Sequence, residues 1–370
     1  MKKIAYLTGS RADFGRATYF LKEIEKDPDL ELHIIATGMH FLDSYGKTIN
    51  EVEKEFNISK KIEIYPKNDS NEEMAKVFGE MVSEFSRIFN EIKPDTLIVL
   101  GDRGEMLAGA ISAQHMNIPV IHIGGGHRSG SIDDRIRDSI SIFSNYHLVA
   151  SEKTSYEVAK LGIKNENIHI VGAPDLEVID KKDFSGSDEI INKYSIDISK
   201  PLVIFSLHSN TTEVNDTPNQ IKTVCEALLE VNLPTIVIYP NSDAGGKIII
   251  EAIDNVLSKN SNFKIYDNIP YKDFLGLMSI SSLMIGNSSA GIIEAPSFGL
   301  PVINIGSRQK NRERSINVTD VDFDKIAIIN SIKDSLHDKE FIQKAKNCKN
   351  PYYKKDTSKS ILRLTKESLK

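Results

Sequence analysis

Short β-rich apolar runs alternate with longer helical patterns from one end of the chain to the other. This alternation is typical of parallel sheets covered on both faces by helices, so the predicted fold class is α/β. At roughly 150 residues per domain, 370 residues suffice for two such domains. Segment 181–200 has weak periodicity and ends in Lys-Pro before a new strand, and we interpret it as the connection between them. The predicted domains are 1–180 and 201–370.

Each predicted domain has its own series of strands. In the first we expect strands at 3–8, 32–37, 61–65, 96–100, 119–123, 147–150 and 169–171, and in the second at 202–207, 235–239, 263–266, 283–285 and 302–305. Helices are expected at 218–231, 246–257, 271–279 and 291–298. The clearest helical pattern runs from Met74 to Ile92 and places apolar residues on one face. Segment 338–370, broken at Asn350-Pro351, is predicted to close the second domain with a helix that crosses back onto the first.

Composition excludes several classes of partner. Forty-six Lys and Arg against 52 Asp and Glu give a net charge of −6, which argues against nucleic acid or a membrane surface as a partner. No apolar run approaches the ~18 residues of a membrane span, and the N-terminal apolar stretch is too short for a secretory signal. We therefore expect a cytoplasmic protein. The cysteines, Cys225 and Cys348, have no CxxC or His partner at metal spacing, so no metal site is predicted.

Ligands of open parallel sheets bind outside the carboxyl ends of the strands, so the residues that follow each strand are the candidates. The turn 9–13 offers backbone N–H groups and the Arg11 guanidinium to an anion, although it would also suit helix capping. Asp102 and Arg103 follow the strand 96–100. A carboxylate beside a guanidinium at this edge indicates either proton transfer or a structural ion pair.

A glycine-rich turn follows the strand 119–123. Its three glycines, 124–126, let the backbone approach a ligand, but the spacing does not match GxGxxG and no Walker lysine follows. Ser131 and Asp134 fit a capping box, and Asp133 with Arg137 fits an i,i+4 pair, so helix stabilisation accounts for part of this motif. His127, at the end of the turn, has no role in a helix cap and is therefore a candidate functional residue.

The second domain carries a predicted diphosphate site. Ser288 and Ser289 lie in a small-residue turn between a strand and a helix, and Arg308 follows the neighbouring strand. Hydroxyls, exposed N–H groups and a guanidinium suit a diphosphate, and Glu294 would accept from ribose hydroxyls. His208 ends the strand 202–207 and is expected at the same edge, where a purely structural role is the alternative. A loop that merely turns is the alternative for Ser288 and Ser289.

Seven segments in chain order, 9–13, 37–40, 101–103, 129–134, 239–245, 286–289 and 306–309, together resemble the hydrolysing UDP-N-acetylglucosamine 2-epimerases of sialic-acid synthesis. The non-hydrolysing sister enzymes carry Gly-Thr-Arg-Pro-Glu and Glu-Arg-Pro-Glu motifs that this chain lacks. The resemblance implies two Rossmann-like, doubly wound domains as in GT-B glycosyltransferases, with the active site in the cleft between them. It also implies a nucleotide-sugar substrate, no cofactor or metal, and a homodimer or homotetramer.

The resemblance further implies elimination of UDP across C1–C2 to a glycal, followed by hydration with inversion at C2. Asp102 and Asp133 would be the acid/base carboxylates. The nucleotide would be held by Arg11, His208, Ser288, Ser289, Glu294 and Arg308. Supporting groups would be His40, Arg103, Arg137 and Asn241.

One departure from the family pattern concerns the glycine turn. Relatives commonly have His-Ile-Glu-Gly-Gly-Glu there, with the first Glu regarded as catalytic, whereas this chain has Gly124 and His127 at the two Glu positions. His127 would take over a proton transfer or contact the substrate, or the turn would have widened at Gly124 for a bulkier sugar. The leading hypothesis is a UDP-N-acetylglucosamine 2-epimerase that releases N-acetylmannosamine. The alternatives are a paralogue acting on a nucleotide-linked 2,4-diacetamido-6-deoxy sugar, a GT-B glycosyltransferase, and a non-catalytic nucleotide-sugar binding protein.

Overall fold

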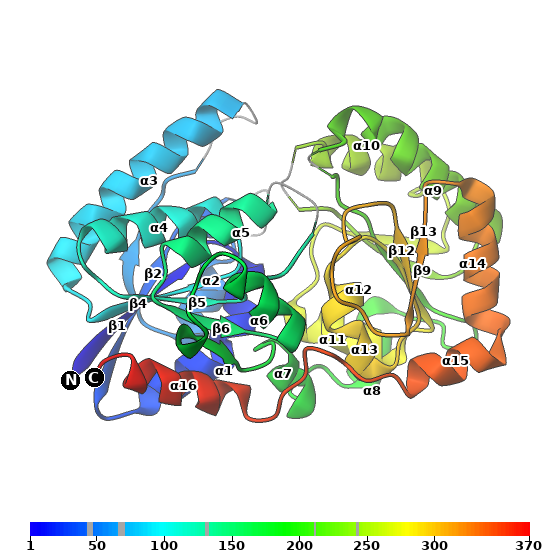
Figure 1. The fold of residues 1–370 in the computed structure, drawn as a ribbon. Coiled ribbons are helices and arrows are strands. Elements are labelled where there is room, and N and C mark those ends of the chain that lie inside the picture. Colours follow the sequence, from blue (N-terminus) through cyan, green and yellow to red (C-terminus); the bar gives the residue numbers. More distant parts are fainter. Residues whose placement is uncertain (43–46, 66–70, 130–132, 211, 242–243) are drawn as a thin grey trace. The chain divides into compact units, whose positions relative to one another are not determined.

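The computed structural model describes residues 1–42, 47–65, 71–129, 133–210, 212–241 and 244–370, with the backbone alone for residues 11, 12 and 71. Within these ranges the chain forms two compact units (Figure 1). The first contains Met1–His127, Asp133–Val178 and Tyr352–Lys370, and the second contains Ile179–Pro351 with Arg128 and Ser129. Each unit is a parallel sheet with helices on both faces, so the predicted α/β class is confirmed.

The first unit contains a seven-stranded parallel sheet in the order β3-β2-β1-β4-β5-β6-β7. Its strands are β1 (Lys2–Thr8), β2 (Leu30–Ala36), β3 (Ile58–Lys61), β4 (Thr96–Leu100), β5 (Val120–Ile123), β6 (Tyr146–Val149) and β7 (Ile168–Ile170). Its helices are α1 (Arg11–Lys26), η1 (Gly38–Phe41), α2 (Ile49–Glu55), α3 (Asn71–Ile92), α4 (Gly104–His115), α5 (Asp133–Ile142), α6 (Glu152–Ala159), η3 (Asn165–Asn167) and α16 (Thr357–Glu367). The strand order reverses between β1 and β4, where a doubly wound sheet binds its ligands.

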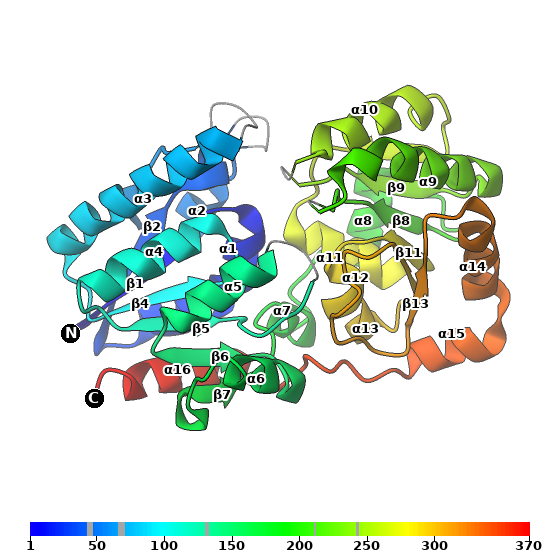
Figure 2. The ribbon, with the colours of Figure 1, turned by 45° about the horizontal axis from the view of Figure 1, so that its top comes forward.

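Alternating side chains of β1 divide the core of the first unit into two layers. Ile4 and Tyr6 pack with α1, α2 and α16 on one face, and Ala5 and Leu7 pack with α3, α4 and α5 on the other. Figure 2 shows α3, α4 and α5 side by side over the sheet. The predicted apolar stripe of α3 packs into this second layer except at Met74, which is 56% exposed because the first turn of the helix extends beyond the core.

The C-terminal segment Tyr352–Lys370 belongs to the first unit, whereas the sequence range 201–370 grouped it with the second. Ile361 and Leu364 of α16 are buried in the layer that α1 covers. Lys366 donates to Asp27 and to Asp29, each at 2.8 Å. Both chain ends therefore lie in the first unit (Figure 1).

The second unit contains a six-stranded parallel sheet in the order β10-β9-β8-β11-β12-β13. Its strands are β8 (Val203–Ser206), β9 (Thr235–Ile238), β10 (Phe263–Tyr266), β11 (Leu283–Gly286), β12 (Val302–Ile305) and β13 (Val318–Val321), of which β13 was not expected from the sequence. Its helices are α8 (Ser187–Tyr194), η4 (Val214–Asp216), α9 (Thr217–Val231), α10 (Gly246–Val256), α11 (Tyr271–Ile280), α12 (Ala290–Ile293), α13 (Ala295–Phe298), α14 (Lys325–His337) and α15 (Lys339–Lys346). α9, α10 and α14 cover one face of the sheet through a single apolar cluster.

Segment 181–200 is not a linker. It contains α8, whose Ile190 and Tyr194 are buried in the second unit, and α8 packs against α11. Asp273 of α11 accepts hydrogen bonds from Lys193 Nζ at 2.6 Å and from Tyr194 Oη at 2.7 Å. With so few apolar residues, α8 has a weak periodic pattern in the sequence, and polar contacts hold it in place. The chain passes between the units within α7 (Leu176–Asp180).

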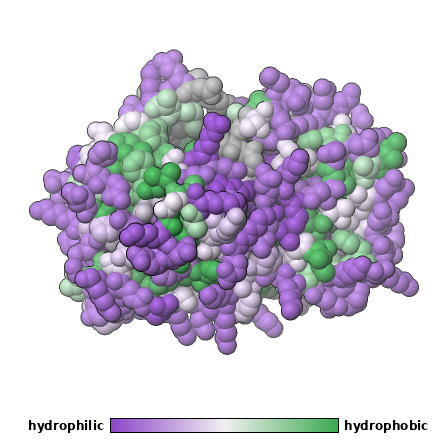
Figure 3. Space-filling model, viewed as in Figure 1, coloured by the Kyte–Doolittle hydropathy of each residue, from purple (hydrophilic) through white to green (hydrophobic). Residues whose placement is uncertain are grey.

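The surface is predominantly polar on the face drawn in Figure 3, where hydrophilic side chains separate the apolar ones into small patches. Large exposed apolar residues such as Ile142, Tyr156 and Ile326 lie on different helices. Among the described helices, none has the length and apolar character needed to cross a membrane.

Candidate functional site

Arg137 joins the predicted acidic residues at the carboxyl edge of the first sheet. Its side chain is 2% exposed and forms an ion pair with Asp102, which follows β4. The same guanidinium donates to Asp134 at 2.8 Å and to the carbonyl oxygen of His127 at 2.6 Å. Burial alone would lower the pKa of Arg137, but the two carboxylates raise it overall, so the guanidinium stays charged. Arg137 pairs with Asp134 in place of the i,i+4 partner Asp133 that the sequence suggested.

His122 holds the turn after β4 in position, and the sequence analysis missed it. Its ring is fully buried, with Nε2 2.8 Å from the carbonyl oxygen of Gly101 and Nδ1 2.9 Å from Ser141 Oγ. Burial lowers the pKa of His122 to about 3, so the ring is neutral. Because a carbonyl oxygen can only accept, Nε2 carries the proton and fixes the residue that precedes Asp102. A histidine inside an apolar strand was the available signal.

Two of the three glycines in the turn differ in what surrounds them. Gly126 has a φ of +79°, and a Cβ there would lie 2.1 Å from the carbonyl oxygen of Thr154, so a side chain is excluded. Gly124 has a φ of +85°, but its nearest neighbour would be the Gly101 nitrogen at 3.8 Å. The described residues therefore leave space beside Gly124, on the side of Gly101, although the positive φ would strain any other residue at this position.

His127 is brought close to Asp102 by its backbone, through the shared contact with Arg137. Its ring packs against Tyr352, with centroids 5.4 Å apart and planes at 49°. Tyr352 is fully buried and comes from the C-terminal segment. The sequence gave no signal for this partner, because 225 residues separate the two positions. Asp133 begins α5 and is partly buried.

The turn after β1 is built around the buried carboxylate of Asp13. Asp13 accepts from Thr8 Oγ1, from Ser10 N at 2.8 Å and from Gly9 N at 3.2 Å. Burial raises the pKa of Asp13 to about 6, although these hydrogen bonds oppose the shift. The backbone of Arg11 starts α1 here, and its side chain lies outside the described part of the chain.

His40 lies beneath the same turn. Its ring is 0% exposed, with Nε2 2.8 Å from Thr8 Oγ1 and Nδ1 2.9 Å from Thr48 Oγ1. Burial, followed by the nearby Arg103 charge, lowers the pKa of His40 to about 4. Both ring nitrogens contact threonines, which hold the ring beneath the turn, and the supporting role expected of His40 stays a prediction.

Glu105 connects three of the sequence motifs, and the sequence analysis did not single it out. Its carboxylate is 3.3 Å from Arg103 Nη2, and its side chain is 10% exposed. A Cβ on Gly9 would lie 3.2 Å from Glu105 Oε1, and one on Gly38 would lie 2.6 Å from it. The glycines of two turns thus leave room for the carboxylate that holds Arg103. The recurrence of glycine in both turns was the signal that could have indicated a close contact.

In the second unit, the predicted residues after β8, β9, β11 and β12 meet at one edge. Asn287 accepts from His208 N at 2.7 Å and donates to His208 O at 2.8 Å. Arg308 Nη1 donates to Asn287 O at 3.1 Å. Ser288 and Ser289 are partly buried at the start of α12, and Glu294, 2% exposed, ends that helix. This edge therefore brings hydroxyls, an imidazole and a guanidinium together.

The tautomer of His208 follows from its contact with Asn241. The backbone N–H of Asn241 donates to His208 Nδ1 at 3.0 Å, and Asn241 Oδ1 lies 3.2 Å from the same nitrogen. A side-chain amide can turn either its oxygen or its NH₂ toward the ring, whereas a backbone N–H can only donate, so the backbone contact decides. Nδ1 is therefore the acceptor and Nε2 carries the proton. Burial and the neighbouring Arg308 charge lower the pKa of His208 to about 3. His208 offers a neutral N–H donor at this edge.

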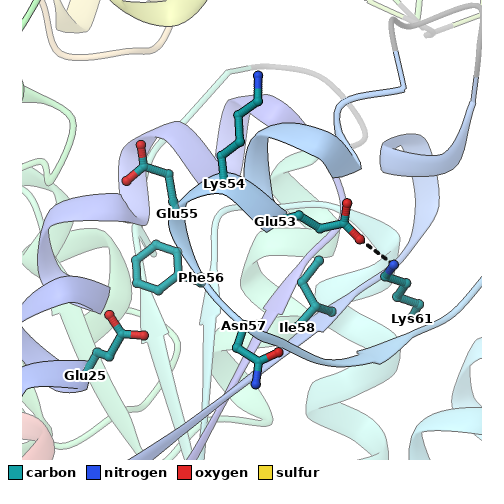
Figure 4. Close-up of a pocket in the computed structure, with 8 residues that line it drawn as sticks. All are labelled: Glu25, Glu53, Lys54, Glu55, Phe56, Asn57, Ile58 and Lys61. Carbon is teal, nitrogen blue, oxygen red and sulfur yellow. Dashed lines mark hydrogen bonds and ion pairs between the residues drawn. The ribbon is translucent and has the colours of Figure 1, made fainter.

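A shallow pocket elsewhere in the first unit lies around the turn between α2 and β3 (Figure 4). Glu53 pairs with Lys61, and Glu55 lies 2.5 Å from Lys22. Three of the charged lining residues are thus in ion pairs, and the lining includes none of the predicted site residues. Its lining residues are Glu25, Glu53, Lys54, Glu55, Phe56, Asn57, Ile58 and Lys61. Among the described residues, no cluster of three or more His, Cys, Asp or Glu could hold a metal ion.

Two doubly wound units with polar residues at the carboxyl edge of each sheet define a GT-B-like α/β protein. Residues 22–366 match the family model described as UDP-N-acetylglucosamine 2-epimerase, and the chain belongs to that family. It is 40% identical over 338 residues to the UDP-N,N'-diacetylbacillosamine 2-epimerase (hydrolyzing) of Legionella pneumophila. The matched region covers 91% of this chain and 89% of the relative. It is 37% identical to the UDP-N-acetylglucosamine 2-epimerase of Neisseria meningitidis serogroup B, over 90% of this chain and 87% of that one.

Solved structures agree on the fold. The UDP-GlcNAc 2-epimerase of Neisseria meningitidis bound to UDP-GlcNAc superposes with a TM-score of 0.83 at 19% identity, over 99% of this chain and all of that one. The Methanocaldococcus jannaschii enzyme in complex with UDP-GlcNAc and UDP gives 0.81 at 20% identity, over 99% of both chains. The resemblance inferred from seven short segments is thus confirmed at the level of family and fold.

Proposed function

We propose that the protein is a hydrolysing nucleotide-sugar 2-epimerase that converts UDP-N-acetylglucosamine to UDP and free N-acetylmannosamine. The observation that carries this proposal is the pairing of Asp102 with buried Arg137 at the end of β4. This pair places a carboxylate at a ligand-binding edge and fixes its direction. Family membership supplies the reaction class, and the two hydrolysing relatives that act on diacetylbacillosamine nucleotides support the hydrolytic outcome.

In the proposed reaction a base removes the proton from C2 of the sugar while the bond between C1 and the diphosphate oxygen breaks. UDP leaves with the bonding electron pair and a 2-acetamidoglucal remains. Water then adds its hydroxyl to C1, and C2 receives a proton on the opposite face. Asp102 and Asp133 are the proposed acid/base groups, because a carboxylate can remove the C2 proton as a base and return one as an acid.

The leaving diphosphate is assigned to the edge of the second unit. Arg308 and the N–H of His208 would neutralise and bind the oxygens that gain charge, together with Ser288 and Ser289. Glu294 would accept from the ribose hydroxyls, and Arg11 would add a further cation. Asn241 supports this role indirectly, because its backbone N–H fixes the tautomer of His208.

A second candidate substrate is a UDP-linked 2,4-diacetamido-6-deoxy sugar. Two relatives, 40% and 37% identical, are named for diacetylbacillosamine nucleotides. The open space beside Gly124 is compatible with a larger C4 substituent on the sugar. If this space sets the substrate, Gly124→Glu should mainly change which of the two sugars is accepted, measured as the ratio of their kcat/KM values.

The reaction itself is tested with each nucleotide sugar in heavy water, followed by proton NMR. The proposal requires UDP and a free C2-epimerised sugar that carries deuterium at C2, because the abstracted proton exchanges with solvent. Protium retained at C2 would contradict elimination. Sugar transferred only to an added acceptor would identify a glycosyltransferase. Binding of the nucleotide sugar without turnover would identify a non-catalytic binding protein. Activity lost with a chelator would contradict the metal-free reaction. The expected cytoplasmic location and homodimer or homotetramer remain predictions.

His127 is proposed as a group that replaces a family glutamate in one proton transfer. If so, His127→Ala should lower kcat by ~10²–10⁴ and remove the acidic limb of the pH–rate profile. Tyr352→Leu serves as the matched control, because it removes the ring packed on His127 but leaves the imidazole in place. Near-normal turnover of His127→Ala with an unchanged profile would assign His127 to substrate contact or to packing instead.

A further inference from the structure

Asn287 connects several elements at the edge of the second sheet, and the reaction proposed above does not use it. It is 2% exposed. Its backbone N–H donates to Ser206 O at 3.2 Å, so it continues the pairing of β11 with the last residue of β8 one residue past the end of β11. Gly286 makes this close approach possible, because a Cβ there would lie 1.9 Å from the Ser206 carbonyl oxygen. The strand ends are therefore held together at Asn287.

The side chain of Asn287 acts on the neighbouring loop as a peptide group would. Its Oδ1 accepts from His208 N at 2.7 Å, and its Nδ2 donates to His208 O at 2.8 Å. Both main-chain polar groups of His208 are thereby fixed by one amide. The position of the His208 main chain determines where the imidazole lies, and the Asn241 N–H determines which ring nitrogen carries the proton.

The carbonyl oxygen of Asn287 holds the other loop. It accepts from Arg308 Nη1 at 3.1 Å and from Gln309 Nε2 at 3.0 Å. Gln309 is itself 1% exposed. A single buried residue thus contacts the main chain of His208 and the guanidinium of Arg308. The imidazole of His208 and this guanidinium follow different strands and are the groups proposed to bind the diphosphate.

We propose that Asn287 is a positioning residue for nucleotide binding, which sets the His208 imidazole and the Arg308 guanidinium in one arrangement for a nucleoside diphosphate. This inference rests on the proposed function. Asn287 itself is not expected to bind the ligand, because each end of its amide already has a partner of the protein. Its substitution should therefore act first through the main chain of His208, because the carbonyl oxygen that accepts from Arg308 remains in every variant.

A double-mutant cycle on the full-length protein, with UDP as the titrated ligand, tests this route. Asn287→Ala should weaken UDP binding by about 10-fold to 100-fold, the range expected when well-placed charge-assisted hydrogen bonds are lost. In a His208→Ala/Arg308→Ala background the same change should cost less than about threefold, because the groups it positions are gone. An undiminished loss in that background, or no loss in the wild-type background, would overturn the proposal.

The tautomer of His208 gives a readout that does not need UDP. In the wild-type protein, ¹⁵N NMR of the imidazole should show Nε2 protonated and Nδ1 unprotonated. Asn287→Ala should produce a mixture of tautomers, whereas Gln309→Leu, which leaves both contacts of the Asn287 amide in place, should not. An unchanged tautomer in Asn287→Ala would contradict the positioning role even if the wild-type protein does not bind UDP, and absence of UDP binding would contradict the proposed function alone.

Asn287→Asp provides a second variant if Asn287→Ala does not fold. It keeps the acceptor for His208 N but faces the carbonyl oxygen of His208 with an oxygen that cannot donate. The His208 ring should again show a mixture of tautomers, while an unchanged far-UV circular dichroism spectrum shows that the variant is folded. A folded Asn287→Asp protein with one intact tautomer would overturn the proposal.

Discussion

The two sheets of this protein carry different chemistry at the same structural position. The edge of the first sheet is built from ion pairs, in which Arg137 holds Asp102 and Asp134, and Arg103 contacts Glu105. The edge of the second sheet is organised by the amide of Asn287 around a neutral His208. Both edges belong to doubly wound sheets, so the fold alone does not account for the difference.

The difference matches what the two halves of the proposed reaction require. Proton transfer at C2 needs a carboxylate whose direction is fixed, and buried Arg137 provides that constraint. Diphosphate binding needs hydrogen-bond donors that are already oriented. Neutral N–H groups beside one guanidinium provide such donors, and they add no second buried charge that would need a partner. We therefore expect substitutions at the first edge to change turnover and those at the second edge to change nucleotide affinity.

The largest expected effect is that of Asp102→Asn on turnover. The substitution keeps the size of the side chain and an acceptor oxygen for Arg137 but removes the base, so kcat should fall by ~10²–10⁴. UDP affinity, measured by titration calorimetry, should stay nearly unchanged because the base acts on the sugar.

Asp134→Asn is the matched control, since Asp134 pairs with the same guanidinium at 2.8 Å and has no assigned proton transfer. A much smaller loss of kcat is expected for it. Equal losses in the two variants would mean that neutralising the partners of Arg137, and not removing a base, explains the effect.

Much of the second edge could be predicted from the sequence. β10 and β12 have the predicted bounds, and β12 is sharply delimited because Pro301 and Gly306 border its apolar run. Parallel strands all point the same way, so the residues that follow them must meet at one edge. The sequence therefore predicts that Ser288 and Arg308 share an edge with His208, and in the structure Arg308 and His208 both contact Asn287.

The buried polar networks could not be predicted in this way. Asp13, His40 and Glu105 form contacts that depend on how three loops approach one another, and hydrophobic periodicity carries no signal for that. α8 was missed for a related reason, because Asp273 and other polar partners replace the apolar stripe that would have identified it. The partner of His127 comes from Tyr352, far along the chain, and only the packing of the C-terminal segment reveals it.

A smaller effect is expected at the second edge. Arg308→Ala should weaken UDP binding by ~1.5–3 kcal/mol, the range for a charge-assisted hydrogen bond, with little change in unfolding temperature. Lys310→Ala is the control, because Lys310 is exposed on the same loop and its substitution removes the same charge. Similar losses in both variants, measured by calorimetry at one salt concentration, would indicate a general electrostatic effect and would weaken the contrast between the two edges.

The smallest expected effect concerns the pH dependence of stability in the first unit. Burial lowers the pKa of His40 from 6.5 to about 4, so folding favours the neutral ring. The stability that His40 contributes is complete above pH 6.5 and is lost as the pH falls from 6.5 through 4. Asp13 acts in the opposite direction, since burial raises its pKa to about 6 and its contribution is lost as the pH rises through that value.

His40→Gln separates these two contributions, because Asp13 remains in both proteins. Between pH 7 and pH 5 the wild-type protein should lose about 1–2 kcal/mol more unfolding free energy than His40→Gln does. Urea unfolding followed by far-UV circular dichroism measures this difference, which suits a chain without tryptophan. His115→Gln, at the exposed end of α4, controls for the loss of a histidine as such. If His40→Gln and the wild-type protein lose equal stability on acidification, the His40 ring is not kept neutral by burial, and the first edge is less rigid than its ion pairs imply.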